Sequence, residues 1–184
     1  AEVAAAALAA GAAVVNDVTA LGDPAMAGLV ASSGAGMVLM HMLGTPRTMQ
    51  EDPHYDDVVN EVGAFLEGRA SEAEAAGMAP DAICIDPGIG FGKTLEHNLA
   101  LLAGVPHLTA SGYPVLIGAS RKSWITMLLG EDLGPEERDP LTVAAHALAI
   151  AGGANVIRVH DVVMGLRSAR IADAIVRGST KGLD

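Results

Sequence analysis

The residues best suited to chemistry lie in three short polar segments, each of which follows an apolar run. The first, residues 86–94, reads DPGIGFGKT. A Walker A motif would need Gly at position 87, which is Pro, and a dinucleotide fingerprint from Gly88 would need Gly at position 93, which is Lys. We interpret the segment as a carboxylate, Asp86, followed by a tight turn whose backbone can approach a flat ligand. The alternative is a purely structural turn that caps the following helix.

The second segment, residues 117–123, reads IGASRKS. Gly118 leaves room where a side chain would block access, and Ser120, Arg121 and Lys122 follow at a predicted helix start. Basic residues there oppose the helix dipole, which makes a purely structural role unfavourable. We interpret Lys122 as a cation that serves an anionic or electron-rich ligand. The alternative is an exposed charged turn.

The third segment, residues 155–161, reads NVIRVHD. Arg158 and His160 are two residues apart, so on a strand they share one side. Such a pair suits a phosphate group. The alternative for His160 is a hydrogen-bonded structural histidine.

Two weaker candidates complete the set. Asn16 ends an apolar run and offers both a donor and an acceptor to a heterocycle. Met40 could line the face of an aromatic ligand, although core packing is the commoner role of Met. We find no Ser–His–Asp or Cys–His arrangement, and the remaining histidines show no metal-ligand spacing.

The apolar runs that precede these residues predict parallel strands joined by helices, because no hairpin turn separates them. The strands should be covered on both faces, since they are almost continuously apolar. We expect strands over residues 13–18, 37–41, 82–86, 114–118 and 155–160, and helices over residues 1–10, 24–34, 55–77, 95–103, 121–129, 141–152 and 163–177.

Every predicted strand ends in a polar or special residue. This favours a TIM (β/α)8 barrel, whose active site gathers side chains from many strand ends, over an open doubly wound sheet. About five strands cannot close such a barrel. We therefore expect residues 1–184 to form a partial barrel domain without its three N-terminal strands, and we expect the natural protein to extend further in that direction.

The composition excludes several classes of protein. The net charge of −11 disfavours nucleic-acid binding, and the only cysteine, Cys84, rules out an internal disulfide. We find neither a signal peptide nor an apolar run long enough to span a membrane, so we expect a cytoplasmic protein with no membrane partner.

Taken in order, the strand ends VNDV at 15–18 and MHM at 40–42, together with the three segments above, resemble the dihydropteroate synthase family up to about residue 177. The resemblance implies a TIM barrel that condenses 6-hydroxymethyl-7,8-dihydropterin diphosphate with 4-aminobenzoate. The products are 7,8-dihydropteroate and diphosphate, in folate biosynthesis. It also implies Mg²⁺ as cofactor, sulfonamides as competitors of 4-aminobenzoate, and a homodimer when the protein is full length.

The resemblance also implies roles for individual residues. Asp86 and Lys122 would be catalytic, Arg158 and His160 would bind the diphosphate, and Phe91 and Ser120 would line the aminobenzoate pocket. The pterin-binding residues would be Asn16, Asp86, Lys122, Met40 and Gly118. The magnesium ligand of the family lies in the N-terminal part that this chain lacks, so we expect no metal site here and no activity of this chain alone.

Two rival interpretations remain open. One is a methyltetrahydrofolate–corrinoid methyltransferase, which shares the Asn and Asp positions but needs no diphosphate site. The segment Ser120-Arg121-Lys122, together with Arg158 and His160, argues against it. The other is a non-catalytic pterin-binding fragment.

Overall fold

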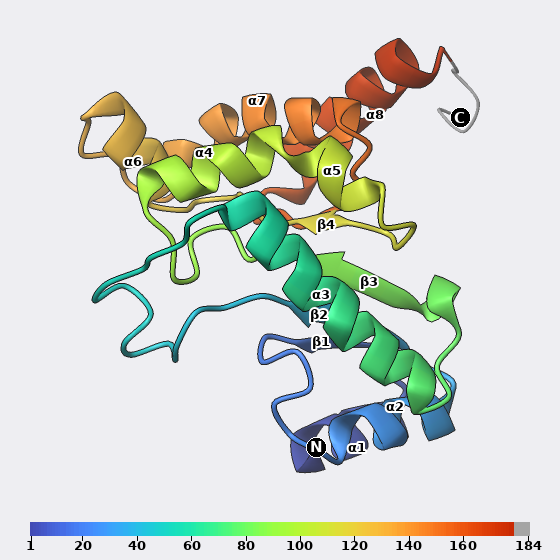
Figure 1. Ribbon diagram of the computed structural model, residues 1–184. Coiled ribbons are helices and arrows are strands. Elements are labelled where there is room, and N and C mark those ends of the chain that lie inside the picture. The colour runs from blue at the N-terminus through green and yellow to red at the C-terminus, as the bar shows by residue number, and fades with distance from the viewer. Residues whose placement is uncertain (179–184) are drawn as a thin grey trace.

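The computed structural model describes residues 1–178 and contains parallel strands alternating with helices (Figure 1). Its strands are β1 (Val14–Asp17), β2 (Gly36–Met40), β3 (Ile83–Asp86), β4 (Leu116–Ile117) and β5 (Val156–Ile157). Its helices are α1 (Glu2–Ala9), α2 (Met26–Ser33), α3 (Val58–Ala75), α4 (Leu95–Ala103), α5 (Val105–Thr109), α6 (Trp124–Leu129), α7 (Arg138–Ala151) and α8 (Val162–Arg177), with a 3-10 turn at Pro80–Ala82.

The strands form two sheets, β1-β2-β3 and β4-β5, and every pairing is parallel. One isolated parallel bridge between Ile85 and Val115 joins the two sheets. The prediction of an α/β fold with parallel strands is therefore confirmed. The carboxyl ends of all these strands consequently point the same way, which places the residues that follow them on one edge.

The last two strands are shorter than the predicted ranges 114–118 and 155–160. Pro114 has no N–H to give to a ladder, and its carbonyl accepts from the Ile85 N–H at 2.8 Å. The Asn155 side chain accepts from the Val115 N–H at 2.9 Å, so a side chain takes one position of the ladder. The pairing ends where the Arg158 N–H donates to the Ile117 carbonyl at 3.0 Å.

The predicted helices are all present, and most have shifted ends. The range 95–103 agrees with α4, which a Thr94–His97 capping box begins. The helix expected from 121 begins only at Trp124, because Arg121 has a left-handed φ of +59° that a helix cannot continue. The helix expected from 141 begins three residues earlier, at Arg138. The short helix α5 was not predicted.

Two apolar clusters form the core. One fills the space among α3, α4, β3, β4, α6 and α7, and the other lies between the β1-β2-β3 sheet and the helices α2 and α3. Figure 1 shows α3 lying across that sheet, with α4, α5 and α7 stacked beyond β4. Within residues 1–178, no helix combines the length and the apolar character that crossing a membrane requires.

Candidate functional site

The polar residues that end the first, third and last strands meet at one place. The Arg158 guanidinium donates to the Asn16 side-chain oxygen through Nη1 and to the Asp86 carboxylate through Nη2, each at 3.2 Å. Asn16 and Arg158 are 142 positions apart in the sequence. The parallel topology thus brings three of the predicted site residues together at the carboxyl edge of the strands.

Asp86 is the most deeply buried of these residues, with 1% of its surface exposed. Its Oδ1 accepts from the Gly88 N–H at 2.8 Å, and its Oδ2 accepts from Arg158. Burial raises the pKa of the Asp86 carboxyl; the Gly88 N–H and then the charges of Arg158, Lys122 and Lys93 act in the opposite direction. The site therefore combines a buried hydrogen-bond acceptor with three nearby cations.

The glycine-rich turn after Asp86 packs closely on the end of β2. Gly88 has a φ of +68°, and a Cβ there would lie 1.9 Å from the His41 carbonyl oxygen, so a side chain at this position requires the backbone to move. The amide oxygen of Asn98 accepts from the Gly90 N–H at 2.6 Å and supports the turn from α4.

Lys122 reaches the same turn from the loop after β4. Its Nζ lies 3.8 Å from the centroid of the Phe91 ring, in a cation–π contact. Burial first, and then the charge of Arg158, lower the pKa of Lys122 to about 8, while the charge of Asp86 opposes the shift. The structure thus brings Lys122 and Phe91 together beside Asp86.

Gly118, at the end of β4, provides the space that Arg158 occupies. A Cβ at Gly118 would lie 2.7 Å from Arg158 Nη2. This glycine therefore determines where the guanidinium lies.

His160 contacts Ser120 rather than Arg158. The buried Ser120 Oγ lies 3.0 Å from His160 Nδ1 and accepts from the His160 N–H at 3.3 Å. No hydrogen bond links His160 to Arg158 within residues 1–178. Both residues lie beyond β5, which ends at Ile157, so they do not share a strand as expected, and their joint role in binding a diphosphate stays a prediction.

The other cation of residues 120–122, Arg121, is already paired with a carboxylate. Its guanidinium makes a bidentate pair with the Asp139 carboxylate at 2.7 and 3.0 Å. Next to it, the Trp124 indole N–H donates to the Ala119 carbonyl at 3.4 Å. Both contacts hold the loop that carries Lys122. Asp139 was not singled out from the sequence, since a distant carboxylate gives no local signal.

Met40 is 1% exposed and lies beneath Gly88, whose hypothetical Cβ would be 3.4 Å from Met40 Cγ. In this structure it is a core residue, and its role as a wall of the pterin site stays a prediction.

Lys93 and His41 are the residues that sequence reasoning missed. Lys93 is 3% exposed, and its Nζ lies 2.9 Å from the Phe91 carbonyl oxygen and 3.0 Å from His41 Nδ1. Burial lowers the pKa of Lys93 to about 7 and that of His41 to about 3. The only sequence signal was the position of Lys93 at the end of the glycine-rich turn, which does not reveal that the side chain folds inward.

The part of the chain that the structure describes contains no group of three or more His, Cys, Asp or Glu side chains suited to a metal ion.

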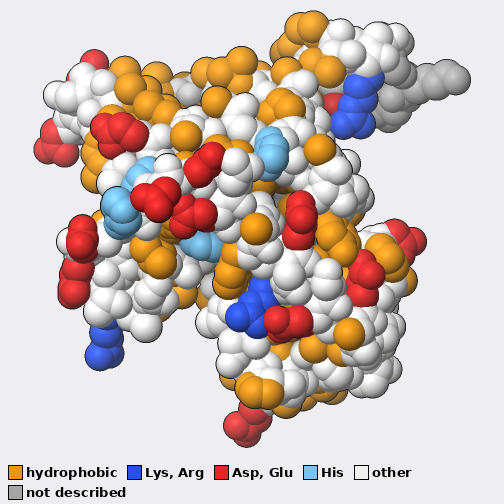
Figure 2. Space-filling view, in the orientation of Figure 1, with side chains coloured by type: hydrophobic (Ala, Val, Ile, Leu, Met, Phe, Trp, Pro, Cys, Tyr) orange, Lys and Arg blue, Asp and Glu red, His pale blue; other side chains and the backbone are white. Residues whose placement is uncertain are grey.

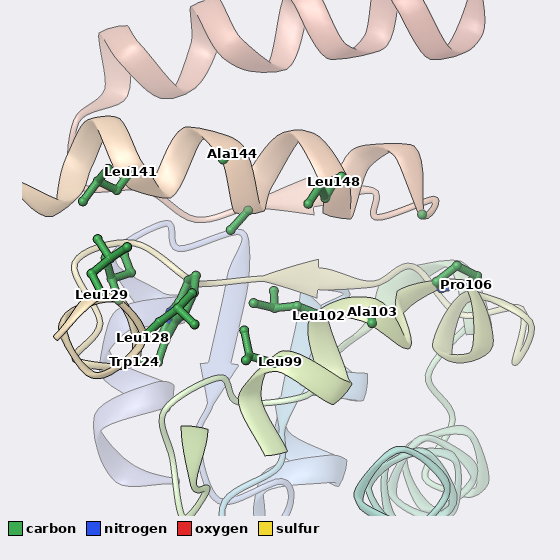
Figure 3. A pocket seen from close by; sticks show the side chains of 13 residues that line it. Leu99, Leu102, Ala103, Pro106, Trp124, Leu128, Leu129, Leu141, Ala144 and Leu148 are labelled. Carbon is green, nitrogen blue, oxygen red and sulfur yellow. The ribbon is translucent and has the colours of Figure 1, made fainter. Parts of the chain in front are cut away.

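A cavity of about 590 Å³ lies elsewhere and is almost wholly apolar. Leu102, Leu128 and Leu148 face it from α4, α6 and α7 (Figure 3). Of the site and loop residues described above, only Trp124 lines it. Hydrophobic side chains also gather along the upper edge of the view in Figure 2, over α6 and α7.

Comparison with known proteins places this geometry in context. Residues 1–160 match the family described as pterin binding enzyme. The dihydropteroate synthase of Neisseria meningitidis serogroup C is 50% identical over 151 residues, which is 81% of this chain and 53% of that protein. The chain spans a little over half the length of the first curated relatives that it matches.

Solved structures agree. The Yersinia pestis dihydropteroate synthase, in a sulfonamide drug complex, is 37% identical with a TM-score of 0.90, over 97% of this chain and 64% of that chain. Two Thermus thermophilus dihydropteroate synthase structures have TM-scores of 0.88 over 95% of this chain. One, in complex with 4-aminobenzoate, is 45% identical, with 70% of its chain covered. The other, in complex with 6HMPPP, is 46% identical, with 68% covered.

Proposed function

Because the chain belongs to the pterin binding enzyme family and its relatives are dihydropteroate synthases, we propose that it forms the pterin- and diphosphate-binding part of a dihydropteroate synthase. The enzyme would condense 6-hydroxymethyl-7,8-dihydropterin diphosphate with 4-aminobenzoate on a TIM (β/α)8 barrel. The observation that carries the proposal is Arg158, which joins Asn16 and Asp86 at the carboxyl edge of the strands.

The buried acceptors suit the polar edge of a pterin. An ionised Asp86 accepts two hydrogen bonds from the N–H groups of an aminopyrimidinone, and Asn16 offers one donor and one acceptor beside it. Both side chains bond to Arg158 in this structure, so a pterin would replace these contacts and leave the guanidinium to face the diphosphate. Gly118 leaves the space that this arrangement needs.

The charged residues of the site suit a reaction in which diphosphate departs. The bond between the pterin methylene carbon and the diphosphate oxygen breaks, the amine nitrogen of 4-aminobenzoate bonds to that carbon, and the nitrogen loses a proton. Lys122 and Arg158 supply positive charge where the diphosphate departs, and preorganised charge of this kind is a large contributor to catalysis. Phe91 offers an aromatic face for 4-aminobenzoate, and Ser120 holds His160 for the diphosphate.

Mg²⁺ remains part of the proposal as a cofactor that neutralises diphosphate charge when bound. Its ligands would include oxygens of the diphosphate, and we assign no step to it.

The methyltransferase alternative is disfavoured by the relatives, which are dihydropteroate synthases. A non-catalytic pterin-binding role stays open for this chain alone, because it spans only part of the length of those relatives.

Two further proposals concern inhibitors and the subunit partner. We propose that sulfonamides compete with 4-aminobenzoate, as the sulfonamide complex of the Yersinia pestis relative suggests. We also propose a cytoplasmic homodimer, with the apolar groove of α4, α6 and α7 as its contact surface. Exposed Leu128 and Leu148 support this.

Calorimetry with the 184-residue chain tests the proposal. We expect the pterin diphosphate to bind more tightly than the bare pterin, and 4-aminobenzoate to bind once diphosphate and pterin are present. Failure to bind any pterin below about pH 8, where Lys122 keeps its positive charge, would contradict it. A parallel turnover assay with both substrates and Mg²⁺ decides whether this chain is active alone, and we expect that it is not.

A further inference from the structure

Lys93 is a buried cation that the proposed reaction does not use. Its side chain is 3% exposed, and within residues 1–178 no carboxylate lies within 4.0 Å of its Nζ. Burying a charged amine without a paired carboxylate costs free energy, so such a residue needs local compensation and often a functional reason.

Two acceptors and one ring provide that compensation. The Nζ donates to the Phe91 carbonyl at 2.9 Å and lies 3.0 Å from His41 Nδ1. It also lies 6.0 Å from the centroid of the Tyr55 ring. Because burial keeps His41 neutral with a pKa of about 3, Nδ1 can accept from the ammonium group. The Phe65 ring in turn contacts the His41 ring in an edge geometry, with 4.9 Å between the two ring centroids.

These contacts place Lys93 behind the residues that face the site. The His41 N–H donates to the Asp86 carbonyl at 2.9 Å, so His41 adjoins the strand end that carries the carboxylate. Lys93 also contacts the carbonyl of Phe91, and the ring of Phe91 lies against the Lys122 ammonium. Lys93 thus contacts two groups near Asp86, the His41 ring and the Phe91 carbonyl, and it is buried, whereas the Arg158 side chain is 42% exposed.

We propose that Lys93 is a positioning residue: it fixes the Phe91 carbonyl and the His41 ring, and it places a positive charge behind Asp86. The proposal rests on the proposed function only in treating Asp86 as the pterin carboxylate. Four groups act on Asp86: the Gly88 N–H, Arg158, Lys122 and Lys93. Among the three cations, Lys93 is the most buried, so solvent and salt screen it least.

The ionisation state of Asp86 follows from this arrangement. An ionised carboxylate can accept from two pterin donors, whereas a protonated one carries an O–H and loses part of that capacity. Burial raises the pKa of Asp86 and favours the protonated form, while the Lys93 charge favours the ionised one. Removing Lys93 should therefore weaken pterin binding most at mildly acidic pH.

Titration of ¹³C-labelled aspartate carboxyls tests the charge effect directly, with the Asp86 signal assigned by its loss in Asp86→Asn. We expect the Asp86 midpoint in Lys93→Met to rise by at least roughly half a pH unit, the lower end of what a nearby charge produces. Asn98→Ala is the matched control, because it loosens the same turn at Gly90 without removing a charge. An unchanged midpoint in Lys93→Met, or an equal rise in Asn98→Ala, overturns the proposal.

A reciprocal measurement avoids any change at Lys93. The sequence contains only three lysines, so ¹³C-lysine labelling resolves the Lys93 signal. Because the Asp86 charge raises the pKa of Lys93, Asp86→Asn should lower the Lys93 midpoint, and an unchanged midpoint contradicts the coupling.

Binding of the bare pterin as a function of pH supplies the functional readout. We expect the acidic limb of the binding curve to move to higher pH in Lys93→Met and to keep its position in Asn98→Ala. If the parent chain binds no pterin at any pH, the proposed function fails, while the two titrations still decide the role of Lys93.

Discussion

Arg158 and Asp86 are 72 positions apart in the sequence, yet the guanidinium of one donates to the carboxylate of the other at 3.2 Å. This bond links the β4-β5 sheet to the β1-β2-β3 sheet at the edge where their strands end. It also places Arg158 beside Asp86, the most deeply buried acceptor of the site. An incoming ligand can replace Arg158 as the partner of this carboxylate.

Replacing Arg158 should weaken binding of the pterin diphosphate much more than binding of the bare pterin. We expect Arg158→Ala to weaken binding of the pterin diphosphate by about 10- to 100-fold, which is the range for one charge-assisted hydrogen bond. Bare pterin should lose only a few-fold. His160→Ala should show the same pattern more weakly, and Arg170→Ala on the exposed face of α8 should show neither loss. Calorimetry that finds equal losses for both ligands in Arg158→Ala contradicts the diphosphate role.

Gly118→Ala should reproduce much of the Arg158 effect without touching Arg158. The added Cβ would lie 2.7 Å from Nη2, and the end of an arginine side chain can move, so the fold should survive while the guanidinium shifts. Gly68→Ala in α3 is the control, because nothing lies within 4 Å of a Cβ there. Unchanged diphosphate affinity in Gly118→Ala would show that Arg158 need not occupy its present place.

Binding of the pterin diphosphate should weaken at basic pH because Lys122 loses its positive charge there. Since its pKa lies at about 8, the positive charge is present below that pH and is lost as pH rises through it. Affinity for the pterin diphosphate should therefore fall above pH 8 in the parent chain and stay flatter in Lys122→Met. In the full-length enzyme, Lys122→Ala should cut turnover by roughly 100-fold or more. Near-normal turnover there rules out the assigned role.

Lys93 should make the stability of the fold rise with pH. Its pKa is about 7 in the folded chain and near 10.5 in an unfolded one, so between these values the unfolded state binds more protons. The free energy of unfolding should increase through this window by at most about 1.4 kcal/mol per pH unit. Urea titrations at several pH values should show this increase in the parent chain and a smaller one in Lys93→Met, where Lys122 with its pKa of about 8 still contributes. A parallel increase in both chains assigns the effect to other groups.

Leu148→Glu tests the proposed homodimer. Leu148 is 72% exposed and lies at the apolar groove, so a charge there should shift sedimentation velocity toward a monomer. Val3→Glu on α1, at a residue that is 84% exposed, is the matched control. A parent chain that sediments as a monomer at every concentration refutes the dimer for this chain.

The pattern of apolar runs was enough to predict the parallel α/β order, because strand and helix periods are local properties. It also placed Asn16, Asp86 and Arg158 at strand ends, and parallel topology alone then required them to share an edge. The ends of elements were less predictable. The residues around Arg121 predict neither its left-handed φ nor its pairing with Asp139.

Contacts that depend on burial escaped sequence reasoning. A lysine after a glycine-rich turn normally points to solvent, and only the packed structure shows that Lys93 turns inward to His41. The burial of Met40 under Gly88 likewise appears only in the packed structure, and its role in lining a pterin site stays a prediction. Strand ends can be read from local pattern, but the direction of a side chain there depends on its neighbours in space.

The chain contains a single tryptophan, Trp124, whose indole N–H donates to the Ala119 carbonyl. That carbonyl lies in the loop between Gly118 and Lys122, and the ring is 7% exposed. When tryptophan is excited selectively, at wavelengths that the two tyrosines do not absorb, the fluorescence of the protein therefore comes from one emitter beside the cationic loop and away from bulk water. A ligand that pulls on Lys122 or Arg158 changes the environment of this one ring, so the protein carries its own optical probe of site occupancy.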